Sequence, residues 1–421
     1  MRRALCPVEA LYVGQRSRAV LSCAVRGRVD AALLARAFDE VIAEHPTLRA
    51  RIAPDGAGHA FELLAERPHL HLRSDVDTAH GDELNDPLPV GGPLVRATLA
   101  SDPPDSPAQR HLLVISIDHA CIDGHSAIAL QNSVWDRYRA LVEGEPPAPA
   151  REPGWPPPIS SLLPPADEAA TAEYLRARLA AVRSNPVDLV PYDGPGVGGR
   201  IEVRRLLLDA ERTTALRAFA RAAGVSVHGL ISAALLSVAR SRLGGDGPRV
   251  LGCLSPVDLR SRLVPPVPPT EMVAAVATHL HALPVEPDPE PVALARELTA
   301  HLREAIARGE HFQDMRITPE VPGHPALQAG TVIATNMGAV PGPRLPHGLE
   351  ITDVRLVPGR EHYFPQAGRS PLMACVVSFD GRLAVELPHH TACFSAEFVR
   401  GFRDDLRAAL SALPAAHELP A

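Results

Sequence analysis

Lysine is absent from this 421-residue sequence, whose 42 basic residues are all arginine. The absence excludes chemistry that needs a Schiff-base lysine or the lysine of a phosphate-binding loop. Exclusive use of arginine is also typical of a GC-rich coding sequence, so the arginines by themselves indicate no ligand. The 49 acidic residues give a net charge of −7. This balance argues against nucleic acid as a partner, because binding it requires a basic face.

Paired cysteines and long apolar runs are missing as well. No two cysteines form a Cys-x-x-Cys pair, which indicates reduced, buried thiols rather than a disulfide or zinc framework. The first residues lack the apolar segment of a signal peptide, and the longest apolar helical stretch, 229–239, is too short to cross a bilayer. We therefore expect a soluble, cytoplasmic protein with no membrane span. The cysteines are Cys6, Cys23, Cys121, Cys253, Cys375 and Cys393.

Aromatic residues are scarce, at 4%, whereas proline occurs 44 times. This composition favours a core of Leu, Val and Ala with many rigid connections. The length exceeds one ordinary hydrophobic core and fits two domains of roughly 200 residues each. Prolines are densest in 145–165, which is the clearest linker in the sequence. We predict an N-terminal domain at 1–165, a crossover at 166–200 and a C-terminal domain at 201–421.

Hydrophobic periodicity predicts helices and strands in both halves, without a regular βαβ repeat. The continuous apolar run 111–117 is typical of a buried central strand, and Asp380-Gly381 marks a hairpin. The expected fold is therefore α/β or α+β, in two layered domains. Strands are expected at 19–25, 48–52, 59–64, 93–100, 111–117, 202–208, 249–255, 331–336, 373–379 and 382–387. Helices are expected at 31–43, 126–141, 167–184, 210–223, 225–243 and 394–413.

The strand at 111–117 runs directly into the polar segment Asp118-His119-Ala-Cys-Ile-Asp123-Gly124. Polar groups at the end of a buried strand are costly unless they are paired or face a cleft. His119 is suited to act as a general base near neutral pH. Asp123 could hold the loop through an arginine, and Gly124 would permit a tight turn into the next helix. A core histidine beside a helix-capping aspartate explains the same pattern equally well.

Four segments resemble one enzyme superfamily, in the same order along the chain. His119-x-x-x-Asp123-Gly124, followed by Ser126, resembles the His-x-x-x-Asp-Gly signature of the superfamily that contains chloramphenicol acetyltransferase, peptide-synthetase condensation domains and polyketide-associated acyltransferases. The other segments look similar to mycobacterial acyltransferases that esterify phthiocerol-type diols: Ser255-Pro-Val-Asp-Leu-Arg260 with Leu263-Val-Pro-Pro-Val-Pro-Pro-Thr-Glu271, Gly348-Leu-Glu-Ile-Thr-Asp-Val354, and Glu386-Leu-Pro-His-His390. The ordered set is a stronger signal than the short signature alone.

The resemblance implies two chloramphenicol-acetyltransferase-like domains, each with a mixed sheet backed by helices, and an interface tunnel that holds the catalytic histidine. His119 would deprotonate a hydroxyl or amine acceptor as it attacks a thioester. Asp123 would be structural and paired with Arg260, which would bring an arginine of the second half against a loop of the first. Asn336 and Ser126 are candidates to line the tunnel or to donate to the oxyanion, although the favoured interpretation of Asn336 is a structural residue at a strand end.

The resemblance also implies the reaction partners. The donor would be an acyl carrier protein or acyl-CoA, and the acceptor a small-molecule alcohol or amine. No cofactor is expected beyond the phosphopantetheine arm that carries the acyl group. We expect a monomer.

One residue departs from the family pattern, because many relatives carry two adjacent histidines and the first position here is Asp118. The second histidine is usually the base, so His119 keeps its expected role. Asp118 could raise the basicity of nearby groups or disturb the loop. Its presence keeps a second hypothesis open, in which the chain has lost acyl transfer and serves as a carrier-docking or binding protein. An amide-forming condensation reaction is a further alternative to ester formation.

Several other residues imitate functional sites. His389-His390 lacks a following Asp-Gly and is interpreted as structural. His119, Asp123 and His125 fit no zinc-ligand spacing, so no metal is expected. Cys121 is interpreted as a small buried residue rather than a nucleophile. The pair His279 and His281 alternates on an extended segment and is expected at the surface or along the tunnel.

Overall fold

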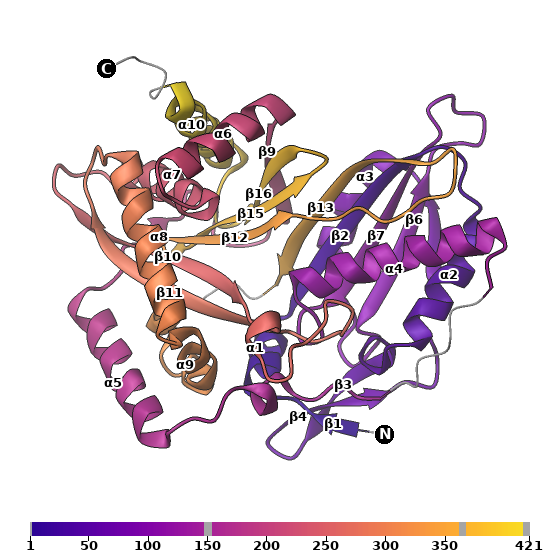
Figure 1. Cartoon of the computed structure of the whole chain (residues 1–421), viewed down its shortest axis with the longest axis horizontal. Helices are drawn as coiled ribbons and strands as arrows, with labels where there is room; N and C mark the ends of the chain where they lie inside the picture. The colour runs from indigo at the N-terminus through magenta and orange to yellow at the C-terminus, as the bar shows by residue number, and fades with distance from the viewer. Residues whose placement is uncertain (1, 147–153, 362–367, 416–421) are drawn as a thin grey trace. The chain divides into compact units, whose positions relative to one another are not determined.

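The computed structural model describes residues 2–146, 154–361 and 368–415. The chain divides into two compact units, and neither is continuous in sequence. Unit 1 comprises Met1–Leu163, Leu259–Ala275 and Val340–His362, and unit 2 comprises Pro164–Asp258, Val276–Ala339 and Tyr363–Ala421. Every sheet described below belongs to a single unit (Figure 1).

The units differ from the predicted continuous ranges. The first boundary, between Leu163 and Pro164, lies beside the predicted end at 165, but Leu259–Ala275 and Val340–His362 return to unit 1. The predicted crossover at 166–200 is not a separate linker either, because α5 (Glu168–Ser184) belongs to unit 2. The hydrophobic periodicity of a segment predicts whether it forms a helix or a strand, but not which distant segment it packs against. The membership of these two segments in unit 1 could therefore not be predicted from their own sequence.

Unit 1 is built around a five-stranded sheet with strand order β13-β2-β7-β6-β5. A smaller sheet has the order β1-β4-β3. The helices α2 and α4 pack on one face of the larger sheet and α3 on the other (Figure 1). The elements are β1 (Arg2–Ala4), α1 (Pro7–Gln15), β2 (Ser17–Arg26), α2 (Ala31–Ala43), β3 (Ala50–Asp55), β4 (Gly58–Leu63), β5 (Leu70–Ser74), α3 (Val76–Asn85), β6 (Val95–Ser101), β7 (Arg110–Asp118), α4 (Gly124–Glu143) and β13 (Glu350–Arg360).

The central strands of this sheet have the apolar character that the sequence predicted. In β7 the residues from Leu112 to Ile117 are all buried. The next strand, β2, pairs with β7 on one side and with β13 on the other, antiparallel in both cases. Helix α2 begins as expected, because the Asp30 carboxylate accepts hydrogen bonds from the backbone N–H groups of Ala32 and Leu33.

Unit 2 contains a six-stranded mixed sheet with strand order β11-β10-β12-β15-β16-β9. The pairs β10–β12 and β12–β15 are parallel, and the other neighbours are antiparallel. The elements are α5, β8 (Val190–Pro191), β9 (Ile201–Leu208), α6 (Ala210–Ala222), α7 (Val227–Ser241), β10 (Arg249–Asp258), β11 (Val276–Val285), α8 (Pro291–Ala307), α9 (Glu310–Arg316), β12 (Val332–Ala339), β14 (Arg369–Ser370), β15 (Leu372–Phe379), β16 (Arg382–His390) and α10 (Ala396–Ala415).

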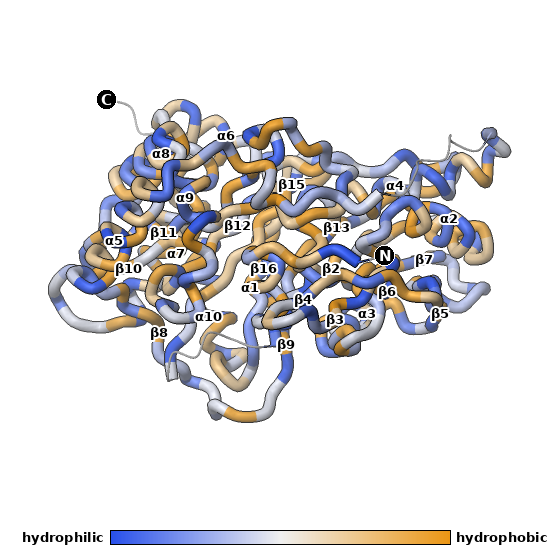
Figure 2. The backbone as a smooth tube through the Cα atoms, turned by 90° about the horizontal axis from the view of Figure 1, so that it is seen from below, coloured by the Kyte–Doolittle hydropathy of each residue, from blue (hydrophilic) through white to orange (hydrophobic). Residues whose placement is uncertain are grey.

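The core of unit 2 forms where α6, α7, α8 and α10 pack on the sheet (Figure 1). Figure 2 shows hydrophobic colour along the strands and hydrophilic colour in many of the peripheral turns. The helix predicted at 225–243 corresponds to α7, and its apolar side chains are buried in this core together with those of the predicted strands. Among the described residues no single helix is both long and apolar enough to cross a membrane, and the pair α6 and α7, which together have the composition, bends by 100° at its junction.

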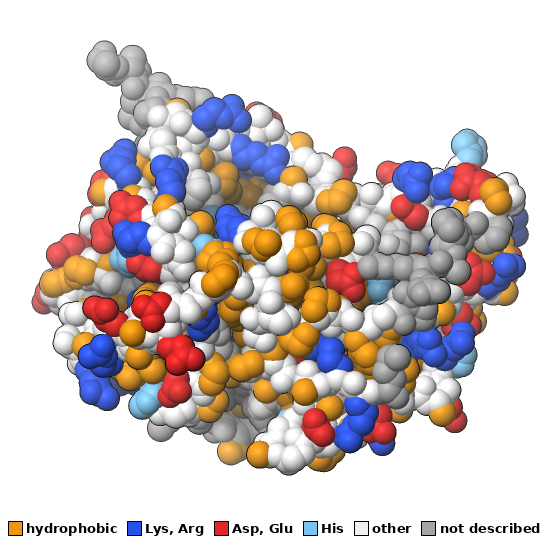
Figure 3. Space-filling model, turned by 60° about the horizontal axis from the view of Figure 1, so that its bottom comes forward, with side chains coloured by type: hydrophobic (Ala, Val, Ile, Leu, Met, Phe, Trp, Pro, Cys, Tyr) orange, Lys and Arg blue, Asp and Glu red, His pale blue; other side chains and the backbone are white. Residues whose placement is uncertain are grey.

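Charged side chains are mixed on the surface that Figure 3 draws. Blue arginines and red acidic residues alternate there with hydrophobic and neutral side chains. The view shows no continuous basic area on this face, in keeping with the net charge of −7.

A buried arginine closes the end of α7. Arg240 is 2% exposed, and its guanidinium donates to the backbone carbonyls of Val285, Gly244, Gly245 and Gly247. These carbonyls belong to the turn after α7 and to the end of β11. The side chain therefore satisfies several backbone acceptors at once in a region that water does not reach.

We expect Arg240→Met to lower the free energy of unfolding by roughly 2–4 kcal/mol, because the loss of a buried hydrogen-bond network lies near the upper end of the effects of single substitutions. Urea denaturation followed by circular dichroism measures the change. Arg212→Met is the matched control, since the Arg212 side chain is largely exposed. Equal midpoints for the two variants would contradict the assignment of Arg240 as a structural residue.

Candidate active site

The loop between β7 and α4 carries the signature residues, and its start is fixed by the sheet. The N–H of Asp118 donates to the carbonyl of Leu94 at 2.8 Å, and the N–H of His119 donates to the carbonyl of Ser17 at 2.9 Å. These bonds continue the sheet pairing one residue beyond β7. The backbone of His119 is consequently held by the first residue of β2, and that of Asp118 by the residue that precedes β6.

The imidazole of His119 lies against an aromatic ring and keeps part of its surface exposed. Tyr12 of α1 stacks on it, with ring centroids 4.1 Å apart and an angle of 12° between the planes. Burial lowers the pKa of His119, and the positive charge of Arg360 also lowers it. The backbone carbonyl of His119 has the opposite effect and raises the pKa. The ring is therefore in its neutral, proton-accepting form at neutral pH.

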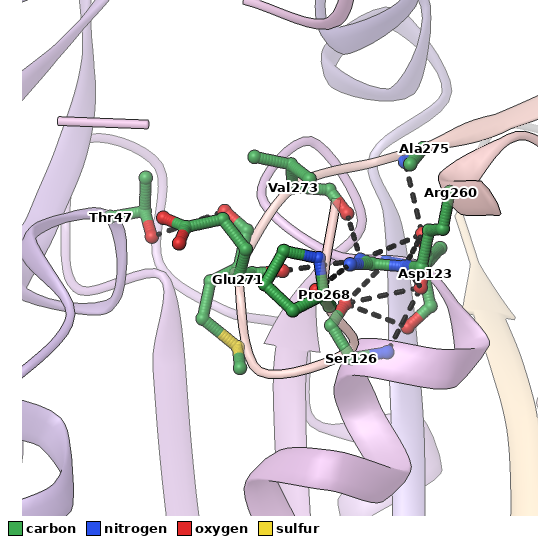
Figure 4. Close-up of polar contacts among 9 residues, drawn as sticks. Thr47, Asp123, Ser126, Arg260, Pro268, Glu271, Val273 and Ala275 are labelled. Carbon is green, nitrogen blue, oxygen red and sulfur yellow. Dashed lines mark hydrogen bonds and ion pairs between the residues drawn. The ribbon is translucent and has the colours of Figure 1, made fainter. Parts of the chain in front are cut away.

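Asp123 lies at the centre of a buried polar network (Figure 4). Its carboxylate accepts from the Nε of Arg260 at 2.9 Å, from the N–H of Ser126 at 2.9 Å and from the N–H of Ala275 at 3.0 Å. An ion pair to the Nη2 of Arg260, also at 2.9 Å, completes the contact. Both side chains are about 5% exposed or less, so the carboxylate is almost fully desolvated and fully paired.

Arg260 binds three backbone carbonyls in addition to the carboxylate (Figure 4). Its Nη1 donates to Pro268 at 2.6 Å, and its Nη2 donates to Glu271 at 3.2 Å and to Val273 at 3.0 Å. The guanidinium thus ties down the whole excursion Leu259–Ala275. The planar fork of five donors suits this task, whereas a lysine could not make the same set of contacts.

The pairing of Asp123 with Arg260 was expected, but its position was not. We expected an arginine of the second half to reach a loop of the first half. The structure shows that Leu259–Ala275 belongs to unit 1, so the ion pair lies within one unit. The reason is that β10 ends at Asp258 and the following residues, from the short 3-10 helix Arg260–Arg262 onward, fold around the start of α4.

Ser126 and Gly124 have structural positions at the start of α4. The Ser126 hydroxyl accepts from the N–H of Asp123 at 3.0 Å, while the Asp123 carboxylate accepts from the N–H of Ser126, which is a reciprocal capping box. Ser126 is fully buried, so its predicted role beside a tunnel or oxyanion is not favoured. Gly124 is the first residue of α4 and its φ is not positive, so the chain enters the helix there without the left-handed backbone that favours glycine.

Asp118 stabilises its own loop. Its carboxylate accepts from the N–H of Ala120 at 2.9 Å, and its carbonyl accepts from the N–H of Cys121 at 3.2 Å. Burial raises the pKa of Asp118 to about 6, against the lowering effects of the Ala120 N–H and of Arg16 and Arg18. The loop remains regular with aspartate at this position.

Cys121 is a buried structural residue, as interpreted from the sequence. Its Sγ lies 3.1 Å from the carbonyl of Asp118, and burial raises its pKa well above the ordinary thiol value. A thiol in this environment is not a nucleophile.

Asn336 lies near the end of β12 in unit 2. Its side-chain oxygen accepts from the N–H of Gly338 at 2.8 Å, at a shift in the register between β12 and β15. This contact supports the structural alternative for Asn336 over a role as an oxyanion donor. The histidines His389 and His390 lie in β16, where the His389 side chain meets the carbonyl of Leu387 and His390 accepts from the N–H of Ala392.

No group of three or more His, Cys, Asp or Glu side chains within residues 2–146, 154–361 and 368–415 could hold a metal ion. These residues include His119, Asp123 and His125.

The expected surface position of His279 is wrong. His279 is 2% exposed, and it contacts Asp314 of α9 at 2.7 Å and His301 of α8 at 3.1 Å through opposite ring nitrogens. Tyr174 of α5 donates to the same carboxylate at 2.8 Å. His281 stacks on His301 with ring centroids 3.5 Å apart. The alternating pattern placed both histidines on a strand but could not show the helices packed over it.

Sequence comparisons relate the chain to a group of mycobacterial transferases. Residues 198–388 match the family described as phthiocerol/phthiodiolone dimycocerosyl transferase C-terminus. The chain is 26% identical over 386 residues to the phthiocerol/phthiodiolone dimycocerosyl transferase of Mycobacterium tuberculosis, with 87% of each chain covered. It is 27% identical over 382 residues to the protein of the same name from Mycobacterium leprae, covering 87% of this chain and 86% of that one.

Solved structures share the fold over nearly the whole chain. Polyketide synthase associated protein 5 from Mycobacterium tuberculosis superposes with a TM-score of 0.76 and 22% identity, covering 99% of this chain and 98% of that one. The trichothecene 15-O-acetyltransferase of Fusarium sporotrichioides gives a TM-score of 0.77 at 12% identity, with 98% and 95% covered. The first condensation domain of the calcium-dependent antibiotic synthetase gives 0.72 at 17% identity, with 99% and 97% covered.

The Arg260 network predicts a large loss of stability when the ion pair is broken. Arg260→Met leaves the Asp123 carboxylate buried without its counter-ion, which typically costs about 3–5 kcal/mol. We expect a correspondingly lower unfolding midpoint in urea, and a smaller loss when Asp123→Asn is combined with Arg260→Met, since the double variant has no unpaired buried charge. Arg262→Met, at an exposed position two residues along, is the control. Additive effects of Asp123→Asn and Arg260→Met would contradict the coupling.

The histidine cluster of unit 2 predicts a fall in stability toward acid pH. Burial, together with the charges of the neighbouring imidazoles, lowers the pKa of His281 to about 3 and that of His301 to about 4. The unfolded chain therefore binds more protons than the folded one below about pH 6.5, so stability is lost as the pH falls from there toward 4. We expect the melting temperature of His301→Gln to depend less on pH between 7 and 5 than that of the parent, as measured by calorimetry.

The matched control is His69→Gln, whose side chain is 69% exposed. It should retain the parental pH dependence. An unchanged slope in His301→Gln would show that the cluster does not contribute to acid sensitivity.

Proposed function

We propose that this chain, which belongs to the polyketide-associated acyltransferases of the chloramphenicol acetyltransferase and condensation-domain superfamily, forms esters with His119 as its general base. The observation that carries the proposal is the state of His119. The imidazole is neutral, partly exposed and held by the end of a sheet, at the position of the superfamily signature. The buried Asp123–Arg260 pair stabilises the loop that follows it.

The proposed reaction requires a single base. The Nδ1 atom of His119 is buried, which leaves Nε2 to accept the proton of a substrate hydroxyl. The alkoxide oxygen bonds to the thioester carbonyl carbon, and the tetrahedral intermediate collapses with cleavage of the carbon–sulfur bond. The imidazolium then returns its proton to the leaving thiolate, so that an ester and a free thiol are released. A placed base contributes about 10²–10⁴-fold, and holding both substrates together supplies much of the remainder.

The donor is proposed to be an acyl group carried as a thioester on a carrier protein or on coenzyme A. A thioester is already activated, so no covalent enzyme intermediate is needed. Support comes from the name of one structural relative, a polyketide synthase associated protein, and from the fold shared with a condensation domain. The phosphopantetheine arm common to both donors would present the thioester.

The acceptor is proposed to be a hydroxyl group of a polyketide-derived lipid or similar metabolite. The curated relatives are named as transferases that act on phthiocerol and phthiodiolone, and a structural relative is an O-acetyltransferase. These names favour ester formation over amide formation. An inactive binding protein was the alternative that Asp118 suggested, but the carboxylate of Asp118 is engaged with Ala120 and leaves the His119 backbone in place.

The decisive test is His119→Ala in the full chain. We expect transfer to fall by at least about 10²-fold, because the variant lacks the base, while the circular dichroism spectrum and melting temperature stay near the parental values. Free thiol released from a panel of acyl-CoA and acyl-carrier thioesters is measured, with long-chain alcohols or amines as acceptors. His69→Ala, at a largely exposed position, serves as the control.

The outcomes separate the alternatives. Undiminished transfer by a folded His119→Ala protein would reject His119 as the base. Product formed only from amines would favour the condensation reaction. An absence of acceptor-dependent thiol release across the panel, together with binding of the acyl carrier, would favour the docking protein.

A further inference from the structure

The proposed reaction makes a negatively charged oxygen, and both donors that the sequence suggested for it have structural contacts instead. When the acceptor oxygen bonds to the thioester carbon, an electron pair of the carbonyl double bond moves onto the carbonyl oxygen. A preorganised donor or positive charge beside this oxyanion is commonly the largest electrostatic contribution to acyl transfer. Ser126, however, is engaged in the cap of α4, and Asn336 binds the N–H of Gly338.

A row of three residues crosses the large sheet of unit 1 at His119. Arg360 of β13 is the register partner of Ser17 of β2 (Figure 1), and the carbonyl of Ser17 accepts from the N–H of His119 at 2.9 Å. Directly opposed residues of antiparallel strands project from the same face of a sheet. Because neighbouring strands lie about 4.8 Å apart, Arg360 and His119 are two strand spacings apart, with the short side chain of Ser17 between them.

The other charges at the end of β13 lie on the opposite face of the sheet. Arg18 follows Ser17 in β2, so its side chain projects from the other face. Its Nη1 pairs with Glu361 at 3.0 Å, and its Nη2 donates to the carbonyl of Leu84 in α3 at 2.6 Å. Glu361 therefore belongs to the α3 side, whereas Arg360 belongs to the side of Ser17.

The guanidinium of Arg360 acts on both rings of the site. Burial lowers the pKa of His119 and the charge of Arg360 lowers it too, whereas the carboxylate of Asp123 raises it. Burial raises the pKa of Tyr12, which stacks on the imidazole from α1, and the charge of Arg360 opposes this. Arg360 is half-buried, so its charge is less screened than that of an exposed arginine.

Ser17 provides an independent sign that a polar atom of a ligand belongs in this row. Its side chain is 1% exposed, and its hydroxyl has no hydrogen-bond partner among the described residues. Native structures leave few buried polar atoms unsatisfied. An oxygen bound beside Arg360 would accept the hydrogen bond that this hydroxyl lacks.

We propose that Arg360 is a further catalytic residue of this chain, whose guanidinium binds the oxyanion that forms when the thioester carbonyl beside His119 is attacked. The inference rests on the proposed role of His119 as the base. A guanidinium keeps its protons throughout, so Arg360 contributes charge and hydrogen bonds but transfers no proton. The electron pair returns to the carbonyl as the carbon–sulfur bond breaks, and the neutral ester then leaves the guanidinium.

Charge and side-chain bulk at position 360 can be separated by two substitutions. Arg360→Met removes the charge and keeps an unbranched side chain, whereas Arg360→Lys keeps a positive charge. Steady-state kinetics are measured on the full chain with an acyl-CoA donor and a long-chain alcohol. We expect kcat of Arg360→Met to fall by roughly 10²–10³-fold, with KM for both substrates changed by less than about threefold. Arg360→Lys should retain more of kcat than Arg360→Met.

The titration of His119 measures the same charge without reference to activity. Its imidazole resonances in the nuclear magnetic resonance spectrum are assigned by comparison with His119→Ala. Removal of a nearby positive charge favours the imidazolium, so the pKa of His119 should rise in Arg360→Met and stay near the parental value in Arg360→Lys. The acidic limb of kcat/KM should move to higher pH in Arg360→Met for the same reason. Arg26→Met, at the exposed far end of β2, is the control.

Three results would overturn the inference. One is a folded Arg360→Met protein with parental kcat. Another is a raised KM for acyl-CoA with kcat retained, which would assign Arg360 to binding of the donor phosphates. The third is an unchanged titration of His119, which would show that the guanidinium does not act on the site. Arg360→Gln replaces Arg360→Met if the latter does not fold. Failure of the proposed function is distinguishable, since it would appear as undiminished transfer by His119→Ala.

Discussion

The candidate site depends on one buried charge, the carboxylate of Asp123. An ionised carboxylate in a protein interior is tolerated only when it is paired and hydrogen-bonded. The neighbouring backbone supplies a donor at Ser126, but the counter-ion has to come from elsewhere, and Arg260 provides it. The excursion Leu259–Ala275 leaves the strands of unit 2 to bring this arginine to the start of α4. The same excursion returns the N–H of Ala275 to the carboxylate.

The two halves of the loop between β7 and α4 are held in place in different ways. Its second half, from Asp123 onward, is rigid because a capping box and an ion pair share the same side chain. Its first half is held by backbone bonds to the adjacent strands. His119 lies between these two fixed points, so its backbone position does not depend on its own side chain. The backbone carbonyls of His119 and Ile122 favour the protonated imidazole, which is the form that the base takes when the acceptor loses its proton.

The sequence predicted those parts of the fold whose signal is local. The run 111–117 became the central strand β7, and the periodic stretches 126–141 and 225–243 became α4 and α7. Long-range pairings were not predictable in this way. Strand β13 joins the sheet beside β2 from the far end of the chain, and nothing in its own pattern identifies that neighbour. The helix α1 also went unpredicted, because its nine residues include Gly14 and show little periodicity.

The same distinction separates the site residues. His119, Asp123 and Arg260 carry a family pattern, so the resemblance indicated both the candidate base and its supporting pair. Tyr12 carries none, since an aromatic residue on a short helix has no local feature that points to a histidine in another element. The burial of His279 was not predicted, because the local pattern showed the strand but not its neighbours. Its alternation with His281 correctly suggested a strand, but burial is decided by what packs on that strand, here Asp314 and His301.

Asp118 lies where many relatives carry a histidine, and its contacts explain how His119 can keep its place beside an aspartate. Asp118 is the last residue of β7, and its backbone N–H and carbonyl, rather than its side chain, make the bonds that extend the sheet and turn the loop. Aspartate adds a bond from its carboxylate to the N–H of Ala120, which tightens the same turn. Burial raises the pKa of this carboxylate to about 6. The charges that act on the His119 imidazole come from other residues, since Asp123 favours the protonated ring and Arg360 disfavours it. The aspartate at position 118 therefore stabilises the turn, while the carboxylate that favours the imidazolium is Asp123, which Arg260 holds in place.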